Sequence, residues 1–214
     1  MKRQLDFSLY LVTDRKLSHP RTIEEVVSSA VKGGVSAVQL REKDCSTREY
    51  IALARRIHNI LKPLNIPLII NDRIDVALAM NADGIHIGQS DMSYGDSRRL
   101  MGTDAIIGLS IETMEQAVEA ENLDVDYLGV SPIFATSTKT DTTTEWGIEG
   151  LRTLRTRSRH TLVAIGGINP SNAAAVMEAG ADGLAVISAI CSSPDPEEAS
   201  RQLRAIIEQH QRRE

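Results

Sequence analysis

The chain has 214 residues, of which 42% are hydrophobic, 25% are charged and 3% are aromatic, and its formal net charge is −5. The acidic balance and the few aromatic side chains argue against a nucleic-acid interface, and Cys45 and Cys191 lack the spacing of a zinc site or a disulfide framework. No run approaches the ~18 apolar residues of a membrane span, and the N-terminus lacks the apolar core of a signal peptide. We therefore expect a soluble, cytoplasmic protein with no nucleic-acid or membrane partner.

Short runs rich in β-branched residues alternate with amphipathic stretches along the whole chain. The predicted strands are Leu9–Thr13, Ala37–Arg41, Leu68–Asn71, Gly84–Ile87, Ile106–Leu109, Tyr127–Val130, Leu162–Ile165 and Leu184–Ile187. Eight βα units in ~200–250 residues have the dimensions of a (β/α)₈ TIM barrel, which we predict as a single domain over residues 1–214. An open doubly wound sheet is the alternative, but the first strand–helix turn, Thr13–Arg21, lacks the glycine fingerprint of a dinucleotide fold.

Four short motifs predict where helices begin. Thr22 with Glu25 and Ser46 with Glu49 have the spacing of capping boxes. Asn169-Pro170 and Asp195-Pro196 each place a capping residue before a proline at the first helical position. These starts agree with the division into βα units.

The second predicted strand ends in Gln39-Leu40-Arg41-Glu42-Lys43. Because side chains alternate along a strand, Gln39, Arg41 and Lys43 should face the substrate, while Glu42 should point away into a structural pair. An amide with two cationic side chains suits a phosphate or diphosphate. The alternative is a solvated strand end with ordinary surface charges.

Asp72 and Asp91 follow the third and fourth predicted strands, so their carboxylates could converge at one edge. With cationic side chains beside them, both should stay ionised, which favours Mg²⁺ binding over acid–base work. The alternative is that either aspartate caps the following helix. His86 lies inside the fourth strand, and we interpret it as a packed barrel histidine.

Two further segments fall at strand ends. Residues 135–145 hold hydroxyl side chains and Lys139, which suits a lid over phosphates, with a disordered linker as the alternative. Gly166-Gly167, together with Ser188 after the last strand, matches the phosphate cradle that loops seven and eight often form in this fold. Either glycine alone would mark only a tight turn.

These motifs resemble the thiamine phosphate synthase family in order and spacing, over essentially the whole chain. The residues that carry the resemblance are Leu9–Asp14, Gln39–Lys43, Asn71–Arg73, Gly88–Asp91, Thr136–Lys139, Ala164–Ile168 and Val186–Ile190. The resemblance implies a transferase that joins hydroxymethylpyrimidine diphosphate to thiazole phosphate. Thiamine phosphate forms with Mg²⁺ as cofactor, diphosphate leaves, and CO₂ leaves as well if the thiazole is carboxylated.

The resemblance also implies a role for each residue of these motifs. The pyrimidine and its diphosphate would be held by Gln39, Arg41, Lys43 and Asn71, with Ser110 in contact with the pyrimidine, and Mg²⁺ would be held by Asp72 and Asp91. The phosphates would be covered by Thr136, Thr138 and Lys139. The thiazole phosphate would be bound by Gly167, Ile187 and Ser188. Arg41, Lys43, Ser110 and Lys139 are then the catalytic residues. A homo-oligomer is compatible with the sequence.

The family mechanism is dissociative, because diphosphate departs before the thiazole nitrogen captures a pyrimidine-methyl cation. This mechanism requires that the negative charge on the diphosphate be stabilised and that the two substrates be positioned. It does not require a nucleophilic triad, and this sequence has none. Two other functions remain as alternatives. A thiazole tautomerase would share the barrel without needing the diphosphate site, and a regulatory barrel would bind ligand without turnover.

Overall fold

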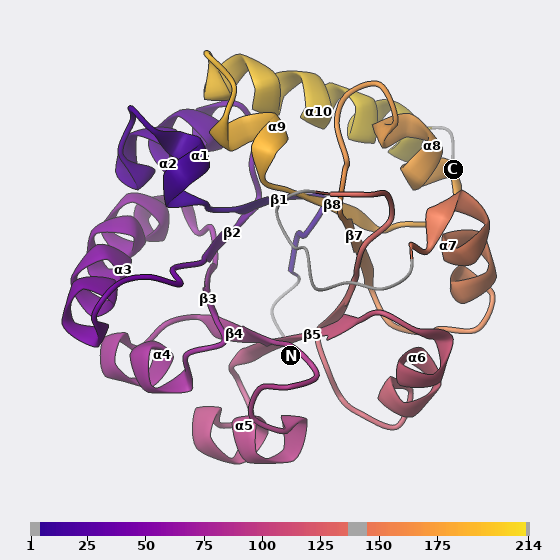
Figure 1. Ribbon diagram of the computed structural model, residues 1–214, viewed down its shortest axis with the longest axis horizontal. Coiled ribbons are helices and arrows are strands. Elements are labelled where there is room, and N and C mark those ends of the chain that lie inside the picture. The colour runs from indigo at the N-terminus through magenta and orange to yellow at the C-terminus, as the bar shows by residue number, and fades with distance from the viewer. Residues whose placement is uncertain (1–4, 137–144, 213–214) are drawn as a thin grey trace.

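The computed structural model describes residues 5–136 and 145–212 and forms a closed barrel surrounded by helices (Figure 1). The strands in these ranges run in the order β1 to β8, all parallel, and β1 closes the barrel by pairing with β8. This confirms the predicted (β/α)₈ architecture. None of the helices in the described ranges is long and apolar enough to cross a bilayer.

The strands of the barrel are short and lie almost where the sequence predicts them. They are β1 (Leu9–Val12), β2 (Ala37–Leu40), β3 (Leu68–Asn71), β4 (Gly84–Ile87), β5 (Ile106–Ile111), β6 (Tyr127–Val130), β7 (Leu162–Ile165) and β8 (Gly183–Val186). β1 and β2 each end one residue earlier than predicted, and just past their ends the backbone N–H of Arg41 donates to the side-chain Oγ1 of Thr13 (3.1 Å). β5 runs on past Leu109, so Ser110 lies within the strand.

Helices follow the strands on the outside of the barrel. They are α1 (Arg15–Ser18), α2 (Ile23–Lys32), α3 (Thr47–Leu61), the 3₁₀ turn η1 (Lys62–Leu64), α4 (Ile74–Met80), α5 (Tyr94–Met101), α6 (Met114–Ala120), α7 (Gly147–Arg155), α8 (Ala173–Glu178), α9 (Ser188–Cys191) and α10 (Pro196–Gln211). Both predicted capping boxes are present, at the starts of α2 and α3, and Asp195 caps α10 with Pro196 at its first position.

The predicted helix start at Asn169-Pro170 is wrong, since α8 begins at Ala173. The side chain of Asn169 accepts from the backbone N–H of Ser171 (2.9 Å), and that of Asn172 accepts from the backbone N–H of Asn169 (2.9 Å). These local hydrogen bonds hold a turn over residues 170–172 and delay the helix.

The apolar side chains form two layers, one between strands and helices and one inside the barrel. The outer layer joins strand residues such as Leu40 and Ile70 to the buried faces of the helices. The inner layer consists of Phe7, Tyr10, Val12, Ala37, Ile69, Ile106, Tyr127, Val163 and Ala185. Phe7 packs against Tyr127, with ring centroids 4.5 Å apart, and Arg204 of α10 donates to the neighbouring Ser8 hydroxyl (2.8 Å). The inner layer forms the floor on which the site is built.

Candidate active site

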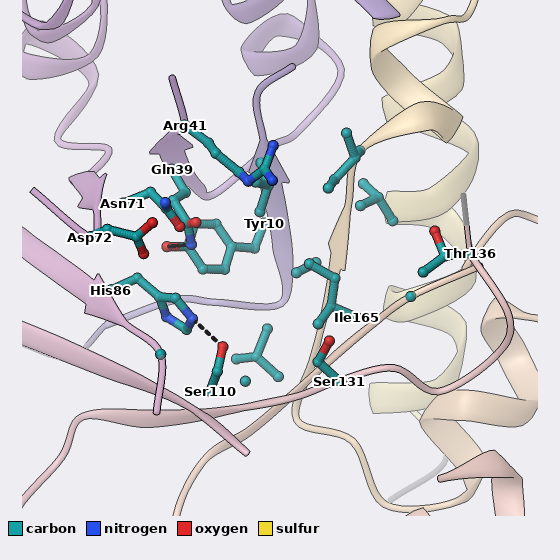
Figure 2. Close-up of a pocket in the computed structure, with 18 of the residues that line it drawn as sticks. Tyr10, Gln39, Arg41, Asn71, Asp72, His86, Ser110, Ser131, Thr136 and Ile165 are labelled. Atoms are coloured by element: carbon teal, nitrogen blue, oxygen red, sulfur yellow. Dashed lines mark hydrogen bonds between the residues drawn. The ribbon is translucent and has the colours of Figure 1, made fainter. Parts of the chain in front are cut away.

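A cavity of about 730 Å³ opens where the carboxyl ends of the strands meet. Every predicted site residue within the described ranges lines it, and Figure 2 labels Gln39, Arg41, Asn71, Asp72, Ser110 and Thr136 among them. They are Gln39, Arg41, Lys43, Asn71, Asp72, Asp91, Ser110, Thr136, Gly167, Ile187 and Ser188. The predicted lid residues Thr138 and Lys139 lie outside the described residues.

The alternation of side chains at the end of β2 continues past the strand. Gln39, Arg41 and Lys43 line the cavity, whereas the side chain of Glu42 is only 4% exposed and pairs with Arg15 at 3.0 Å. Glu42 therefore points away into a structural pair, as the alternation predicts. The charges at this strand end are not simply a solvated surface.

Carboxylates hold both cations of this segment at the cavity. Nη1 of Arg41 lies 3.8 Å from Oδ2 of Asp14, and both side chains are less than a quarter exposed. Nζ of Lys43 lies 2.9 Å from Oδ2 of Asp72, which also lines the cavity. The two cations are thus positioned in advance for a polyanionic ligand.

Asp72 and Asp91 come together at the ends of β3 and β4. Burial and then the nearby charge of Asp72 raise the pKa of Asp91, while the backbone N–H of Gly88 (2.7 Å) and the charge of Lys43 act in the opposite direction. Asp72 has a left-handed backbone (φ 60°), which is uncommon for a non-glycine residue. A left-handed aspartate next to a second carboxylate whose pKa is raised is typical of a functional site.

Neither aspartate caps the helix that follows it. The N-cap residue of α4 is Arg73, whose side chain makes no capping hydrogen bond among the described residues. The N-cap residue of α5 is Ser93, whose side chain does make one. The capping alternative is therefore wrong for both. The described residues contain no cluster of three or more His, Cys, Asp or Glu that could enclose a metal. A pair of carboxylates nevertheless fits Mg²⁺, which often takes one or two protein carboxylates and completes its shell with water and phosphate oxygens.

Gly166 and Gly167 form the wall of the cavity after β7. Both have positive φ (107° and 65°), and a Cβ on Gly166 would lie 2.9 Å from the backbone Cα of Pro132 and 3.1 Å from the backbone nitrogen of Ile133. Backbone therefore runs against backbone here, and glycine is required for this approach. On the neighbouring strand end, α9 begins at Ser188, and Gly167 and Ser188 line the same cavity.

Sequence reasoning missed the buried polar residues beneath this mouth. Tyr10, Tyr127 and His86 line the cavity floor and join Gln39 to Ser110 through hydrogen bonds. His86 is packed, as predicted, at 9% exposure, but it also contacts Ser110 (Figure 2). The inward-facing positions of β1, β4 and β6 were the available signal, since period-two alternation places these residues on the cavity side.

The chain is similar to proteins of known activity over nearly its whole length. The family profile described as "Thiamine monophosphate synthase" matches residues 9–190. The thiamine-phosphate synthase of Albidiferax ferrireducens is 54% identical over 200 residues, covering 94% of this chain and 91% of that one. The enzyme of the same name from Syntrophomonas wolfei is 51% identical over 205 residues, covering 96% and 98%. The structure of thiamine phosphate pyrophosphorylase from Pyrococcus furiosus superposes with a TM-score of 0.88 at 36% identity, covering 96% and 97%.

Proposed function

The chain belongs to the thiamine monophosphate synthase family, and on that premise we propose that its cavity joins a pyrimidine diphosphate to a thiazole phosphate. The observation that carries this proposal is the meeting of two cations and two carboxylates on one wall. Lys43 contacts Asp72 at 2.9 Å, and Arg41 and Asp91 line the same cavity. A diphosphate with a bound divalent cation has the charges that this wall complements.

In the proposed reaction, the bond between the pyrimidine methylene carbon and the diphosphate oxygen breaks, and its electron pair leaves with the diphosphate. The thiazole nitrogen then donates its lone pair to the methylene cation. Arg41 and Lys43 stabilise the negative charge that grows on the departing oxygen, and neither step needs a general base. Gln39, Asn71 and Ser110 orient the pyrimidine so that its methylene faces the incoming nitrogen.

Asp72 and Asp91 are the residues that would hold Mg²⁺, whose charge would add to the neutralisation of the diphosphate. The charge of Asp72 is one of the causes that raise the pKa of Asp91, after burial, and this supports the assignment because a bound cation would offset that repulsion. Lys43 now contacts Asp72, so it can turn from the carboxylate to the ligand without leaving the wall. Its side chain is 54% exposed and has room to do so.

The opposite wall suits the second substrate. Gly167, Ile187 and Ser188 would bind the thiazole phosphate, with bare backbone at Gly167 and the start of α9 at Ser188 toward the phosphate. Thr136, at the rim, together with Thr138 and Lys139, would cover the phosphates of both substrates. The two anionic groups would then be held on separate walls, which leaves the methylene carbon of the pyrimidine and the nitrogen of the thiazole free to meet.

The proposal is tested by incubating the purified chain with both substrates and Mg²⁺ and following thiamine phosphate and diphosphate. We expect both products in equal amounts, and none with chelator. Interconversion of thiazole phosphate tautomers without any condensation would instead support the tautomerase alternative. Binding of either substrate without turnover would support a regulatory barrel.

A further inference from the structure

The connection between β1 and α2, residues 13–22, lies beside both walls of the cavity. It includes α1, which lies beside α9 (Figure 1), and its first residues contact the loop that follows β2. Its two arginines, Arg15 and Arg21, are not among the residues that line the cavity. Neither takes part in the proposed reaction, yet each makes hydrogen bonds to one of the two walls.

Arg21 holds the carboxyl end of α9. Its guanidinium donates through Nη2 to the carbonyl oxygens of Ser193 (2.5 Å) and Cys191 (3.3 Å), and through Nη1 to that of Pro194 (3.4 Å). The thiol of Cys191 also donates to the Val12 carbonyl (3.8 Å), so the same end of α9 is tied to β1. The arginine thereby satisfies carbonyl groups that the end of a helix leaves free.

α9 needs such bonds because it is a single turn of four residues. One turn has very few hydrogen bonds of its own, and forming the first turn of a helix is unfavourable in isolation. A positive charge at the carboxyl end also favours the helix dipole. Ser188 begins this turn and lines the cavity, about 4.5 Å along the helix axis from Cys191. The position of Ser188 at the cavity therefore depends on where Arg21 holds the other end.

Arg15 holds the opposite wall through Glu42. Nε of Arg15 donates to Oε2 of Glu42 (3.0 Å), whose side chain is only 4% exposed. Oε1 of the same carboxylate is buried and has no hydrogen-bond partner among the described residues. Removing the cation from such a pair leaves a buried charge that must reach water. Because Glu42 stands between Arg41 and Lys43 in the chain, a movement of its side chain toward water would displace both of these cations.

We propose that the connection between β1 and α2 positions the two substrate walls separately, with Arg21 setting the place of the thiazole phosphate and Arg15 that of the pyrimidine diphosphate. Both are positioning residues, because they act on the substrates through Ser188 and through the loop after β2. The inference rests on the proposed function, since it takes these two compounds as the ligands of the two walls. A single change outside the cavity should therefore weaken the binding of one substrate and not of the other.

Steady-state kinetics with Mg²⁺, in which each substrate is varied in turn, test this separation. We expect Arg21→Ala to raise KM for the thiazole phosphate about tenfold, the affinity that one charge-assisted hydrogen bond supplies, and to leave KM for the pyrimidine diphosphate nearly unchanged. Arg15→Ala should do the reverse. Two KM values that rise together in either variant would overturn the inference, because a general loss of structure affects both walls. Two KM values that stay at the wild-type level would overturn it as well.

Arg98→Ala is the matched control. Arg98 donates through Nη1 to the carbonyl oxygens of Gly102 (2.9 Å) and Ala105 (2.6 Å) past the end of α5, as Arg21 does at the end of α9. These carbonyls precede β5 and therefore lie at the end of the barrel away from the cavity. We expect this variant to lower the melting temperature and to leave both KM values unchanged. A thiazole phosphate KM raised as much as in Arg21→Ala would overturn the inference.

Lysine variants keep the test decisive if an alanine variant does not fold. Arg21→Lys retains a charge near the end of α9 but lacks the planar fork that reaches several carbonyls at once, so KM for the thiazole phosphate should still rise. Arg15→Lys retains the charge beside Glu42, so KM for the pyrimidine diphosphate should stay near the wild-type value. An unchanged KM in the first variant, or a KM in the second as high as in Arg15→Ala, would contradict the role given to that arginine.

Failure of the proposed function gives a different result from failure of this inference. A wild-type protein that forms no thiamine phosphate from the two substrates would overturn the proposed function and the inference with it. A wild-type protein that forms thiamine phosphate, with variants whose two KM values do not separate, would overturn the inference alone.

Hydrogen exchange followed by mass spectrometry tests the two contacts without any ligand. The backbone N–H groups of Cys191 and Ser192 donate to carbonyls at the start of the same turn, so a loosened α9 should exchange them faster. In Arg21→Ala we expect faster exchange in the peptide that covers α9 and wild-type exchange over residues 39–46. Arg15→Ala should show the opposite pattern. Wild-type exchange of α9 in Arg21→Ala would overturn the inference, even if KM for the thiazole phosphate rises.

Discussion

Arg41 reaches the cavity from a position just past the end of β2, and Asp14 holds its guanidinium there at 3.8 Å. Such a preorganised donor typically contributes about 10²–10³ to kcat. We expect Arg41→Ala to lower kcat by about that factor with an unchanged circular dichroism spectrum. Arg99→Ala is the control, because it removes an arginine whose partner, Asp96, lies on the exposed face of α5. Equal losses in both variants would remove Arg41 from the reaction.

Asp14 offers a second test of the same arrangement. Its carboxylate accepts from the backbone N–H of Leu17 and also faces Arg41, so it both caps α1 and positions the guanidinium. Asp14→Asn keeps a capping oxygen but removes the charge that attracts Arg41. We expect KM for the pyrimidine diphosphate to rise while the melting temperature changes little. A large loss of stability with unchanged KM would show that Asp14 serves the helix alone.

Among single residues, the charged members of the site could be predicted from the sequence, whereas the aromatic members could not. Gln39, Arg41 and Lys43 stand out because polar side chains interrupt an apolar run. Tyr10 and Tyr127 do not stand out, since a tyrosine inside a buried strand resembles any core residue until the closed barrel turns both toward one axis. Their mutual contact joins positions 117 residues apart, which no local pattern records.

The start of α3 is held by a capping box whose parts are all exposed. The Ser46 hydroxyl accepts from the backbone N–H of Glu49 (3.3 Å), satisfying a donor that the helix leaves free. We expect Ser46→Ala to lower the free energy of unfolding by about 1 kcal/mol, measured by urea denaturation. Ser28→Ala, the same change inside α2, should have a smaller effect. A loss no larger than that of Ser28→Ala would show that the box contributes nothing.

Glu49 makes the same helix start sensitive to acid. The hydroxyl and then the backbone N–H of Ser46 donate to its carboxylate and lower its pKa. This stabilisation is present above the pKa of the unfolded chain, about 4.3, and is lost as the pH falls through the lower folded value. The melting temperature of Glu49→Ala should therefore lie below that of wild type at pH 7 and approach it below about pH 4. A gap that stays constant with pH would contradict the assignment.

Helix starts could be predicted from the sequence where a capping side chain bonds to the helix backbone with a known spacing. The prediction failed where a different side-chain hydrogen bond formed in the same segment. Both capping boxes start helices, as does Asp195 before Pro196. Asn169-Pro170 has the same kind of sequence, but Asn172 accepts from the Asn169 backbone and forms a turn first. Spacing alone does not distinguish these two uses of an asparagine side chain.

We expect burial in the outer layer and exposure to the cavity to have different consequences when an isoleucine is truncated. Ile70 lies in the outer layer and is fully buried, so Ile70→Ala should lower the free energy of unfolding by about 2–5 kcal/mol with kcat of the folded protein unchanged. Ile187 lines the cavity, and Ile187→Ala should instead raise KM for the thiazole phosphate. Urea denaturation and steady-state kinetics on both variants check the pair. Exchanged effects would mean that the layers are not separate in function.

The barrel itself was predictable because strand and helix patterns repeat in strict alternation, and eight repeats suffice to close a ring. The order of the strands also explains why Asp72 and Asp91 were expected at one mouth, since they follow the adjacent strands β3 and β4. The floor could not be predicted in the same way. Phe7 precedes the first strand and carries no periodic pattern, yet it packs beneath Tyr127.

The pairing of β1 with β8 has a consequence for synthesis on the ribosome. The first strand emerges before the other strands of the barrel, but its partners Leu184, Ala185 and Val186 emerge after all of them. Arg204, which bonds to Ser8, emerges later still. Until then the nascent chain exposes one unpaired edge on β1 and another on its newest strand, both open to pairing with other chains. The pairing that leaves the finished barrel without open edges therefore cannot protect its growing form until β8 has been made.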